Sequence, residues 1–591
     1  MSKAEALSNL LEWGFQNGVI LPENIEFLHD EIKGIHCICT GTVARPTMTL
    51  PSSLIISGQL AKNVFHNETE DNTWLKFLFA KLKYDTEATV DDENIDLKIK
   101  FKPYIDALPK RIDSVLVWNP EELETLLGGT NLGNSHREKL YSIFKEWYEL
   151  LKKQPPSSPF FDLNKVETDL LIFENWNETS YDIIYEKLIT DTINQTPTIW
   201  YSFSGFLWSH LIFISRAFPE YIVNKNCEES AVILLPIIDL MNHHYSSKVS
   251  WSSNEEGAFI YQNQMVLEKG DELLNNYGAK GNEELLASYG FVLEDNAFDL
   301  VMLRIKLPLP LIEEILINDD GYDIHLPTME EYTTFAFDQE EKKQDKNATK
   351  KTPMDYQDGI IYIINRNNVD VCLRPLIQIF TYLSKTPMES LEDLRPTLEG
   401  LEKLRVAIQQ KMAPLEREIA TANLDPHRYN CATTYRNGQI NVLSSASSEL
   451  KRKEKELMSK NKRNLITVSK ISKYDPTFIE VELPNMIPRR LQGTDIEFDS
   501  TFDIFVIWII LKIRNNSLPD KYNWVHAQYD TCSTSISLSE LQVNDAHAFY
   551  NHYFNGIDTV PFEEVERSFK FVVNNSFNTV TSEETILVRQ L

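Results

Sequence analysis

Strand-forming segments on both sides of a long helical block are the feature that most restricts the fold of this chain. Before the block, "GIHCICTGTVARPTMTLPSSLIIS" (residues 34–57) alternates β-branched residues with turn formers and predicts two or three short strands. From about residue 63 to residue 196 the apolar residues recur at helical spacing, and strand-like sequence then returns as far as "NNYG" (275–278). Because short strands need partners, we expect one β-rich unit that a helical insert splits.

The helix signals inside and after the block are specific. In "WNPEELETLLGG" (118–129), Asn119 is the expected cap, Pro120 the first helical residue, Glu122 the partner in a capping box and Gly128 the stop. A shorter amphipathic helix is expected near the N-terminus. The segment "PTIWYSFSGFLWSHLIFISRAF" (197–218) predicts another helix with one broad apolar face.

The chain changes character after about residue 310. The segment 338–352, "DQEEKKQDKNATKKT", is almost free of apolar residues and predicts a solvated or disordered loop. Long helices are expected around 389–420 and 440–464, and "FDIFVIWIILKI" predicts a buried helix. The run "KRKEKELMSKNKR" (451–463) could touch nucleic acid, although such a run is more often the charged face of a solvent-exposed helix.

The composition is that of a folded, acidic protein. Of 591 residues, 42% are hydrophobic, and 87 acidic against 58 basic residues give a formal net charge of -29. Such a charge repels phosphate backbones and favours a basic partner, although acidity often serves solubility alone. We therefore expect a basic protein as partner and no direct binding of nucleic acid.

Cysteine usage and apolar runs indicate a reducing compartment. The six cysteines are Cys37, Cys39, Cys227, Cys372, Cys431 and Cys532. Only the first two lie close together, which suits neither a zinc framework nor a set of disulfides. The first residues lack a signal-peptide pattern, and the longest apolar runs are too short to span a bilayer. We expect a cytoplasmic location, with the nucleus as a second one, no membrane contact, and a monomer.

A polar segment follows an apolar run in "LLPIIDLMNHHYSSKVSW" (234–251). A metal site there would need a third ligand of defined geometry, because the adjacent His243 and His244 cannot easily share one ion. A nuclease would need a surface that accepts phosphates, which the net charge disfavours. Taken alone, the segment also fits a strand end whose polar groups satisfy the backbone.

Neighbouring motifs decide between these alternatives. A D-x-x-N-H step at Asp239–His243, an N-Y-G step at Asn276–Gly278 and an E-L-x-x-x-Y-G-F step at Glu284–Phe291 follow the S-R-A-F end of the preceding helix in this order. Together with the split β-rich unit, they resemble the SET-domain protein-lysine methyltransferases, in the branch of the Rubisco large-subunit methyltransferase. Most of the chain shares this resemblance, which is nearest to the fungal ribosomal lysine methyltransferases.

The resemblance implies an α+β fold: a β-rich SET domain split by a helical insert, then an all-α C-terminal domain that binds the protein substrate. The expected bounds are 1–62 and 197–310 for the two SET parts, 63–196 for the insert and 311–591 for the C-terminal domain. S-adenosyl-L-methionine is the implied cofactor, and the implied reaction is methyl transfer to a lysine of a large-subunit ribosomal protein. The alternative is a SET-like binding module that has lost turnover.

The resemblance also implies roles for single residues. Tyr277 corresponds to the catalytic tyrosine, which also touches the cofactor. The other expected cofactor-binding residues are Asn242, His243, Arg216 and Gly34, and the expected substrate-binding residues are Ser215, Phe218, Asp239 and Tyr289. Structural alternatives stay open: Tyr277 could be a buried strand-end tyrosine, His243 a core histidine, Arg216 a cap of its own helix and Asp239 a turn cap. We expect His244 to be structural and no metal to be bound.

The implied chemistry explains the residue types. Methyl transfer to an amine is an in-line displacement, so positioning dominates. A lysine must arrive neutral, and deprotonating a free lysine of pKa about 10.4 at pH 7 costs about 4.6 kcal/mol. A narrow aromatic channel disfavours the ammonium, while tyrosine hydroxyls can hydrogen-bond the amine.

Two departures from the family pattern stand out. The usual G-x-G step before the first strand reads "KGIHCI", so Gly34 is kept but His36 replaces the second glycine. Histidine disfavours positive φ, which puts that cofactor contact in question and favours the binding module. No cysteine triplet follows "NYG", so the zinc-bound segment of histone-directed relatives is absent and the C-terminal helices must shape the substrate entrance.

Overall fold

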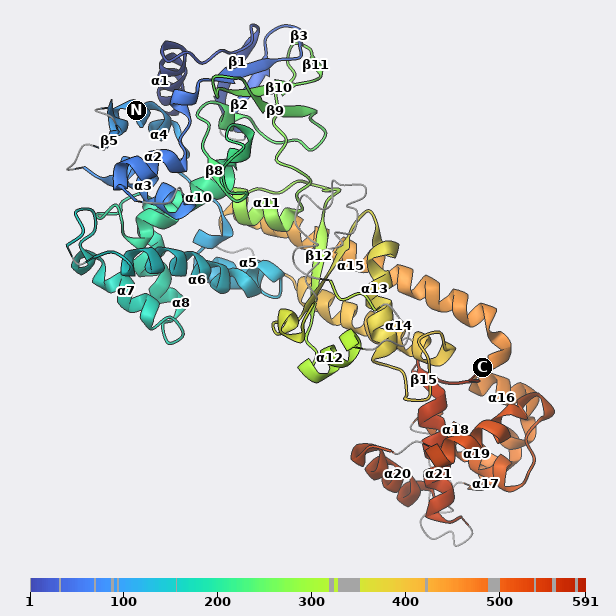
Figure 1. The fold of residues 1–591 in the computed structure, drawn as a ribbon. Helices are drawn as coiled ribbons and strands as arrows, with labels where there is room; N and C mark the ends of the chain where they lie inside the picture. The colour runs from blue at the N-terminus through green and yellow to red at the C-terminus, as the bar shows by residue number, and fades with distance from the viewer. Residues whose placement is uncertain are drawn as a thin grey trace. The chain divides into compact units, whose positions relative to one another are not determined.

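A computed structural model describes residues 2–590 except 31–32, 68–70, 87–89, 93–94, 156, 318–323, 328–350, 420–423, 487–499, 536–537, 555–559 and 580–582. The chain forms two compact units (Figure 1), of which the first contains Met1–Asp299 and Arg417–Gly438. The second contains the remaining described residues from Leu300 onward. Most of the loop expected over 338–352 lies outside the described residues.

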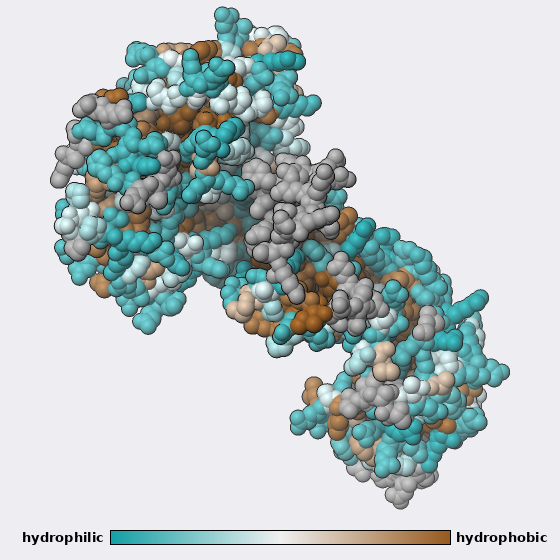
Figure 2. Space-filling model, viewed as in Figure 1, coloured by the Kyte–Doolittle hydropathy of each residue, from teal (hydrophilic) through white to brown (hydrophobic). Residues whose placement is uncertain are grey.

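Hydrophilic residues cover most of the face that Figure 2 shows, in keeping with the charge of the chain.

The first unit joins small sheets to a helical block. Its helices are α1 (Lys3–Gln16), α2 (Gly58–Phe65), α3 (Asn72–Tyr84), α4 (Leu97–Ala107), α5 (Pro120–Leu127), α6 (Asn131–Lys152), α7 (Glu167–Glu174), α8 (Tyr181–Ile184), α9 (Thr190–Asn194), α10 (Phe203–Arg216) and α11 (Asn282–Tyr289). Its strands are β1 (Ile25–Asp30), β2 (Gly34–Cys39), β3 (Val43–Ala44), β4 (Thr47–Leu50), β5 (Asp91–Asp92), β6 (Ile95–Asp96), β7 (Phe218–Pro219), β8 (Val232–Ile233), β9 (Val249–Ser253), β10 (Phe259–Asn263) and β11 (Val266–Leu267).

Strands from before and after the helical block pair with one another. β4 pairs with β10, and β3 pairs with β11, both antiparallel. Single bridges join Ile56 to Leu234 and Ile38 to Glu272. The β-rich unit is therefore split by a helical insert, as the sequence predicts, because neither half has a complete set of strand partners alone.

Local signals set the helices of this unit. Asn119 accepts a hydrogen bond from the amide of Glu122 at 2.8 Å, and α5 ends at Gly128. The expected capping box is only half formed, because the Glu122 carboxylate is buried against Arg428 instead. The apolar face of α10 packs on α3, where the rings of Phe79 and Trp208 stack at 5.3 Å.

The second unit is mainly helical but not all-α. Its helices are α12 (Leu309–Ile317), α13 (Val369–Tyr382), α14 (Leu394–Met412), the part of α15 (Pro426–Lys460) from Gln439 onward, α16 (Val468–Tyr474), α17 (Leu483–Met486), α18 (Thr501–Arg514), α19 (Trp524–Ser535), α20 (Glu540–Tyr553) and α21 (Phe562–Asn575). Five strands, β12 (Leu300–Ile305), β13 (Ile360–Asn365), β14 (Leu465–Ile466), β15 (Ser576–Asn578) and β16 (Thr585–Val588), form two small sheets that the sequence analysis did not predict. The predicted buried helix is α18, whose residues 505–510 are buried on all sides.

The segment 417–438 departs from the expected division of the chain. It belongs to the first unit, although the sequence assigns it to a C-terminal domain that begins at residue 311. Its residues explain this: Arg428 pairs with Glu122 of α5, and Tyr435 donates to Glu283 of α11 at 2.8 Å. These groups are buried, so the start of α15 is part of the core of the first unit.

Within the described part of the chain, no helix is long and apolar enough to cross a membrane.

Candidate functional site

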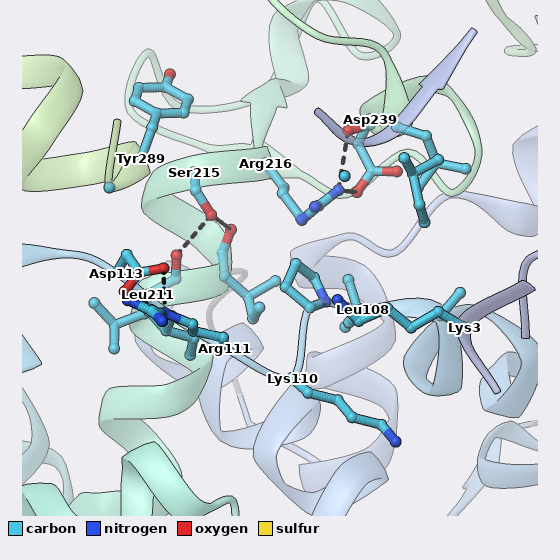
Figure 3. Close-up of a pocket in the computed structure, with 18 of the residues that line it drawn as sticks. Lys3, Leu108, Lys110, Arg111, Asp113, Leu211, Ser215, Arg216, Asp239 and Tyr289 are labelled. Carbon is cyan, nitrogen blue, oxygen red and sulfur yellow. Dashed lines mark hydrogen bonds and ion pairs between the residues drawn. The ribbon is translucent and has the colours of Figure 1, made fainter. Parts of the chain in front are cut away.

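A cavity of about 540 Å³ lies in the first unit, where segments distant in sequence converge. Residues of α1, β2 and α10 line it together with the segment 106–114, Asp239, Asn242, Tyr277 and the end of α11. Figure 3 shows Ser215, Arg216, Asp239 and Tyr289 around this cavity. Seven sequence-predicted site residues therefore line one cavity: Gly34, Ser215, Arg216, Asp239, Asn242, Tyr277 and Tyr289.

Backbone pairing brings the amide–histidine step beside the later tyrosine. His243 and Asn275 form a parallel bridge, in which the amide of Asn275 donates to the carbonyl of Asn242 at 2.7 Å. The amide of Tyr277 donates to Nδ1 of His243 at 3.0 Å. Because two segments that lie far apart in sequence are joined by these bonds, Asn242 and Tyr277 reach the same cavity.

Three rings stack at the cavity, of which those of Tyr277 and Tyr289 line it. The His243 and Tyr277 rings have centroids 4.9 Å apart, and the Tyr277 and Tyr289 rings also lie at 4.9 Å. The Tyr277 hydroxyl donates to the carbonyl of Met241 at 2.8 Å. Burial raises the pKa of Tyr277 to about 12 and also raises the pKa of Tyr289. Both phenols therefore stay protonated near neutral pH and act as hydrogen-bonding groups rather than as bases.

His243 supports Tyr277 and does not itself line the cavity. Burial, with the nearby His244 and Lys280, lowers the pKa of His243 to about 4. The ring is therefore neutral, and Nδ1 is the acceptor for the amide of Tyr277. The structure places His243 as a residue that positions Tyr277, while the predicted cofactor contact stays a prediction.

Arg216 and Asp239 form a buried pair at the cavity. Arg216 Nη1 donates to the backbone carbonyl of Asp239 at 3.0 Å and to its Oδ2 at 3.1 Å. The hydroxyl of Tyr104, from α4, donates to the same Oδ2 at 2.8 Å. Burial raises the pKa of Asp239, while Arg216 and Tyr104 oppose this rise. Arg216 thus bonds to the segment that contains Asp239. These bonds account for its position without the alternative role as a cap of its own helix.

The turn that holds Asp239 is strained. Ile237 precedes it at φ 71°, a left-handed value that β-branched residues rarely adopt. Such a conformation costs on the order of 1–3 kcal/mol and is typical of functional sites. No sequence signal marks this residue.

Gly34 and Asn242 shape another part of the wall. Gly34 has φ 67°, and a Cβ added there would meet no atom within 4 Å, so the glycine leaves open space at the cavity. Asn242 Nδ2 donates to Glu272 Oε1 at 2.9 Å, and Lys33 pairs with Glu272 at 2.7 Å. An open backbone cradle beside amide and carbonyl groups suits an adenosyl cofactor with an amino-acid end, so these residues fit S-adenosyl-L-methionine.

His36, which replaces the second glycine of the family's G-x-G step, does not need a positive φ in this structure. It lies within β2, paired with Leu28 in the β1–β2 ladder, and is not among the residues with positive φ. Its ring is buried, with Nδ1 3.2 Å from the carbonyl of Gly34. The objection to cofactor binding that rested on backbone strain therefore does not hold.

Two expected substrate residues differ in their placement. The Ser215 hydroxyl lines the cavity and donates to the carbonyl of Leu211 at 2.8 Å. Phe218 does not line the cavity: its ring packs on Trp251 at 5.1 Å and Phe259 at 5.6 Å, in the core. The side chain of Phe218 thus faces the sheet in this structure, and its expected contact with the substrate stays a prediction. His244 is exposed and bonds Ser246, as expected of a structural residue.

The helical insert contributes residues to the site that no sequence motif indicates. Tyr104 holds Asp239, and residues 106–114 form a wall of the cavity. Arg111 in this wall pairs with Asp113 at 2.7 Å and with Asp425 at 3.0 Å. No motif distinguishes these residues from others in the insert, since their role comes from packing alone. The described residues contain no cluster of three or more potential metal ligands.

The chain is similar in sequence to known protein-lysine methyltransferases. The chain is 45% identical to "Ribosomal lysine N-methyltransferase 1" of Saccharomyces cerevisiae over 99% of its length and 100% of that protein. It is 26% identical to "Protein-lysine N-methyltransferase EFM1" of the same yeast over 93% of the chain and 90% of that protein. Residues 333–461 match the family described as the EFM1 middle domain. A solved structure, "Structure of Rubisco LSMT bound to AdoMet", aligns with a TM-score of 0.49 at 18% identity over 76% of this chain and 93% of that one.

Proposed function

Because this chain belongs to the SET-domain protein-lysine N-methyltransferases, as its full-length relative shows, we propose that its substrate is a large-subunit ribosomal protein. The enzyme is S-adenosyl-L-methionine-dependent and methylates a lysine ε-amine. One observation carries the assignment of the site: Tyr277, Asn242, Arg216 and Gly34 line a single cavity, although they come from four separate segments.

Tyr277 and Tyr289 explain how a substrate lysine can reach the neutral, reactive form of its amine. S-adenosyl-L-methionine, when bound, supplies an electrophilic methyl group. The stacked rings of Tyr277 and Tyr289 exclude water on one side of the cavity, which lowers the pKa of an amine that enters. The Tyr277 hydroxyl donates to Met241, so its oxygen lone pairs remain for an N–H of the lysine. No strong base is required.

Arg216, Asp239 and Tyr104 supply fixed polar groups on another wall. Because Asp239 compensates the charge of Arg216, the pair adds no net charge that would repel a cationic cofactor. Their mutual bonds hold the wall rigid before ligands bind, which favours positioning over rearrangement.

The substrate proposal has two supports. The relative that covers the whole chain is named for ribosomal lysine methylation. The formal net charge of -29 attracts the basic proteins of a ribosome.

The proposed location is the cytoplasm, with the nucleus as a second site of action, and the proposed state is a monomer. The binding-module alternative rested on His36, and the extended backbone at His36 removes that support.

The test is methyl transfer from a labelled cofactor to separated large-subunit ribosomal proteins, followed by mass spectrometry of the labelled band. We expect one protein to be labelled on lysine by the native chain and not by the Tyr277→Phe variant. Labelling confined to small-subunit or non-ribosomal proteins would refute the substrate proposal. Equal labelling by both chains would refute the role of Tyr277.

A further inference from the structure

The basic run at 451–463 divides into two parts in the structure. Within α15, Arg452 pairs with Glu449 at 2.7 Å, and Lys460 pairs with Glu456 at 2.6 Å. Lys453 pairs with Asp370 at 2.6 Å. This part is a charge-balanced helix face, the commoner of the two alternatives that the sequence left open.

The lysines that follow α15 are arranged differently. Lys473 and Lys521, from distant segments, lie over the ring of Tyr474, while Lys470 lies near Lys521 and Tyr474 and Lys462 lies beside Lys470; we call these five residues the lysine patch. Lys521 Nζ lies 3.6 Å from the centroid of the Tyr474 ring, and Lys473 Nζ lies 5.4 Å from it. Lys470 Nζ donates to the carbonyls of Lys462 at 2.6 Å and Leu465 at 2.8 Å.

The charge of the lysine patch is not neutralised. Among the described residues, no carboxylate lies within ion-pair distance of its four ammoniums. The neighbouring Asp475 is buried, where it accepts hydrogen bonds from Trp508 at 2.9 Å and Lys512 at 3.1 Å. Asp520 precedes Lys521 in an exposed turn without pairing to it.

The lysines are close enough to repel one another. Burial and the charge of Lys521 lower the pKa of Lys470, and the hydrogen bond and charge of Lys521 lower the pKa of Tyr474. An anion bound among these lysines would relieve their repulsion. The exposed Tyr474, with 41% of its surface accessible, adds an aromatic face at the centre.

We propose that the lysine patch binds single-stranded RNA, with its ammoniums on phosphates and a base against the exposed part of the Tyr474 ring that Lys521 leaves open. An acidic polypeptide would use the lysines equally, but it would gain nothing from the exposed ring, whereas ring and ammoniums together suit a nucleic-acid strand. The proposal revises the expectation of no nucleic-acid contact, which followed from the net charge of the whole chain rather than from this surface. It goes beyond the proposed methyl transfer and would direct the enzyme to RNA-rich particles.

The test is the fluorescence anisotropy of a labelled single-stranded RNA titrated with the full chain over a series of salt concentrations. Replacing Lys470 and Lys521 by glutamine should reduce the slope of log affinity against log salt by about 1.4, since each phosphate contact contributes roughly 0.7 for a single strand. Tyr474→Leu should weaken binding roughly fivefold or more at constant salt.

The matched control is the Lys451→Gln/Lys455→Gln variant, which removes two exposed lysines from α15 outside the lysine patch. It should bind RNA as the native chain does, and all variants should keep the native melting temperature. Equal losses in control and patch variants, no change with Tyr474→Leu, or equal competition by poly-glutamate would each overturn the proposal. Intact methyl transfer to free protein would show that such a failure leaves the proposed function standing.

Discussion

At the residue scale, Tyr277 is held by two independent bonds, one from its amide to His243 and one from its hydroxyl to Met241. Its ring also stacks between His243 and Tyr289. The backbone and ring contacts do not need the hydroxyl, so the hydroxyl can be removed without moving the ring. This separates a chemical role from a structural one.

We predict that Tyr277→Phe lowers the rate of methyl transfer by roughly 100-fold or more, the loss typical for one positioned hydrogen-bonding group. Cofactor affinity should change little, because the ring contacts remain. Single-turnover kinetics and calorimetric titration of the cofactor measure the two effects separately. A loss of affinity as large as the loss of rate would mean that the hydroxyl binds the cofactor and does not serve the chemistry.

Gly34 offers a second test at this scale, because the chain contains a matched control. Gly34 has φ 67° and Gly270 has φ 93°, and a Cβ at either position would meet no atom within 4 Å. Alanine should therefore cost each variant about 1–2 kcal/mol of stability from backbone strain alone. Only Gly34 lines the cavity, so only Gly34→Ala should also weaken binding of S-adenosyl-L-methionine. Equal affinities of the two variants in calorimetry would exclude Gly34 from the cofactor site.

At the element scale, the start of α15 completes the first unit. Arg428 pairs with Glu122 of α5, Arg436 donates to the carbonyl of Leu126 at 3.2 Å, and Tyr435 reaches Glu283 of α11. An apolar cluster of α5, α6 and α11 residues closes around Tyr435. Because α11 ends at Tyr289, this packing fixes an element that lines the cavity.

Breaking the buried pair should destabilise this unit. Arg428→Met leaves the Glu122 carboxylate buried without its partner, which should cost about 3–5 kcal/mol. The double variant Glu122→Gln/Arg428→Met should recover a large part of that loss, because no uncompensated charge remains. Urea unfolding followed by tryptophan fluorescence measures both. Additive losses would mean that the two side chains do not act as a pair.

At the scale of the whole molecule, buried neutral histidines should make the first unit sensitive to acid. Burial lowers the pKa of His136 to about 4, of His210 to about 3 and of His243 to about 4. An unfolded histidine takes up its proton near pH 6.5, so the unfolded state binds more protons below that pH. The stabilising contribution of these neutral side chains is complete above about pH 6.5 and is lost as the pH falls toward 4.

We therefore predict a melting temperature that is steady above pH 6.5 and decreases below it. His210→Asn should lessen this decrease, because its ring lies in the core and Asn does not titrate. Calorimetry between pH 4 and pH 8 measures the slopes. A melting temperature that stays constant down to pH 4.5 in the native chain would contradict the assignment of these rings as neutral and buried.

The sequence by itself determined the fold class, the split β-rich unit and the members of the site that stand in ordered motifs. These features are local: strand and helix periodicity, caps such as Asn119, and the polar steps around Asn242 and Tyr277 are properties of short windows. The family of the chain could be inferred from the same windows.

Only the tertiary structure decided what depends on contacts between distant segments. Tyr104, the wall at 106–114 and the start of α15 enter the first unit through packing, which leaves no periodic trace in the sequence. Phe218 follows the site motif but turns into the core, and His36 is acceptable because its backbone is extended. Lys521 joins the lysine patch only in the folded chain. Its charge can be read from the sequence, but the fold decides which residues lie beside it.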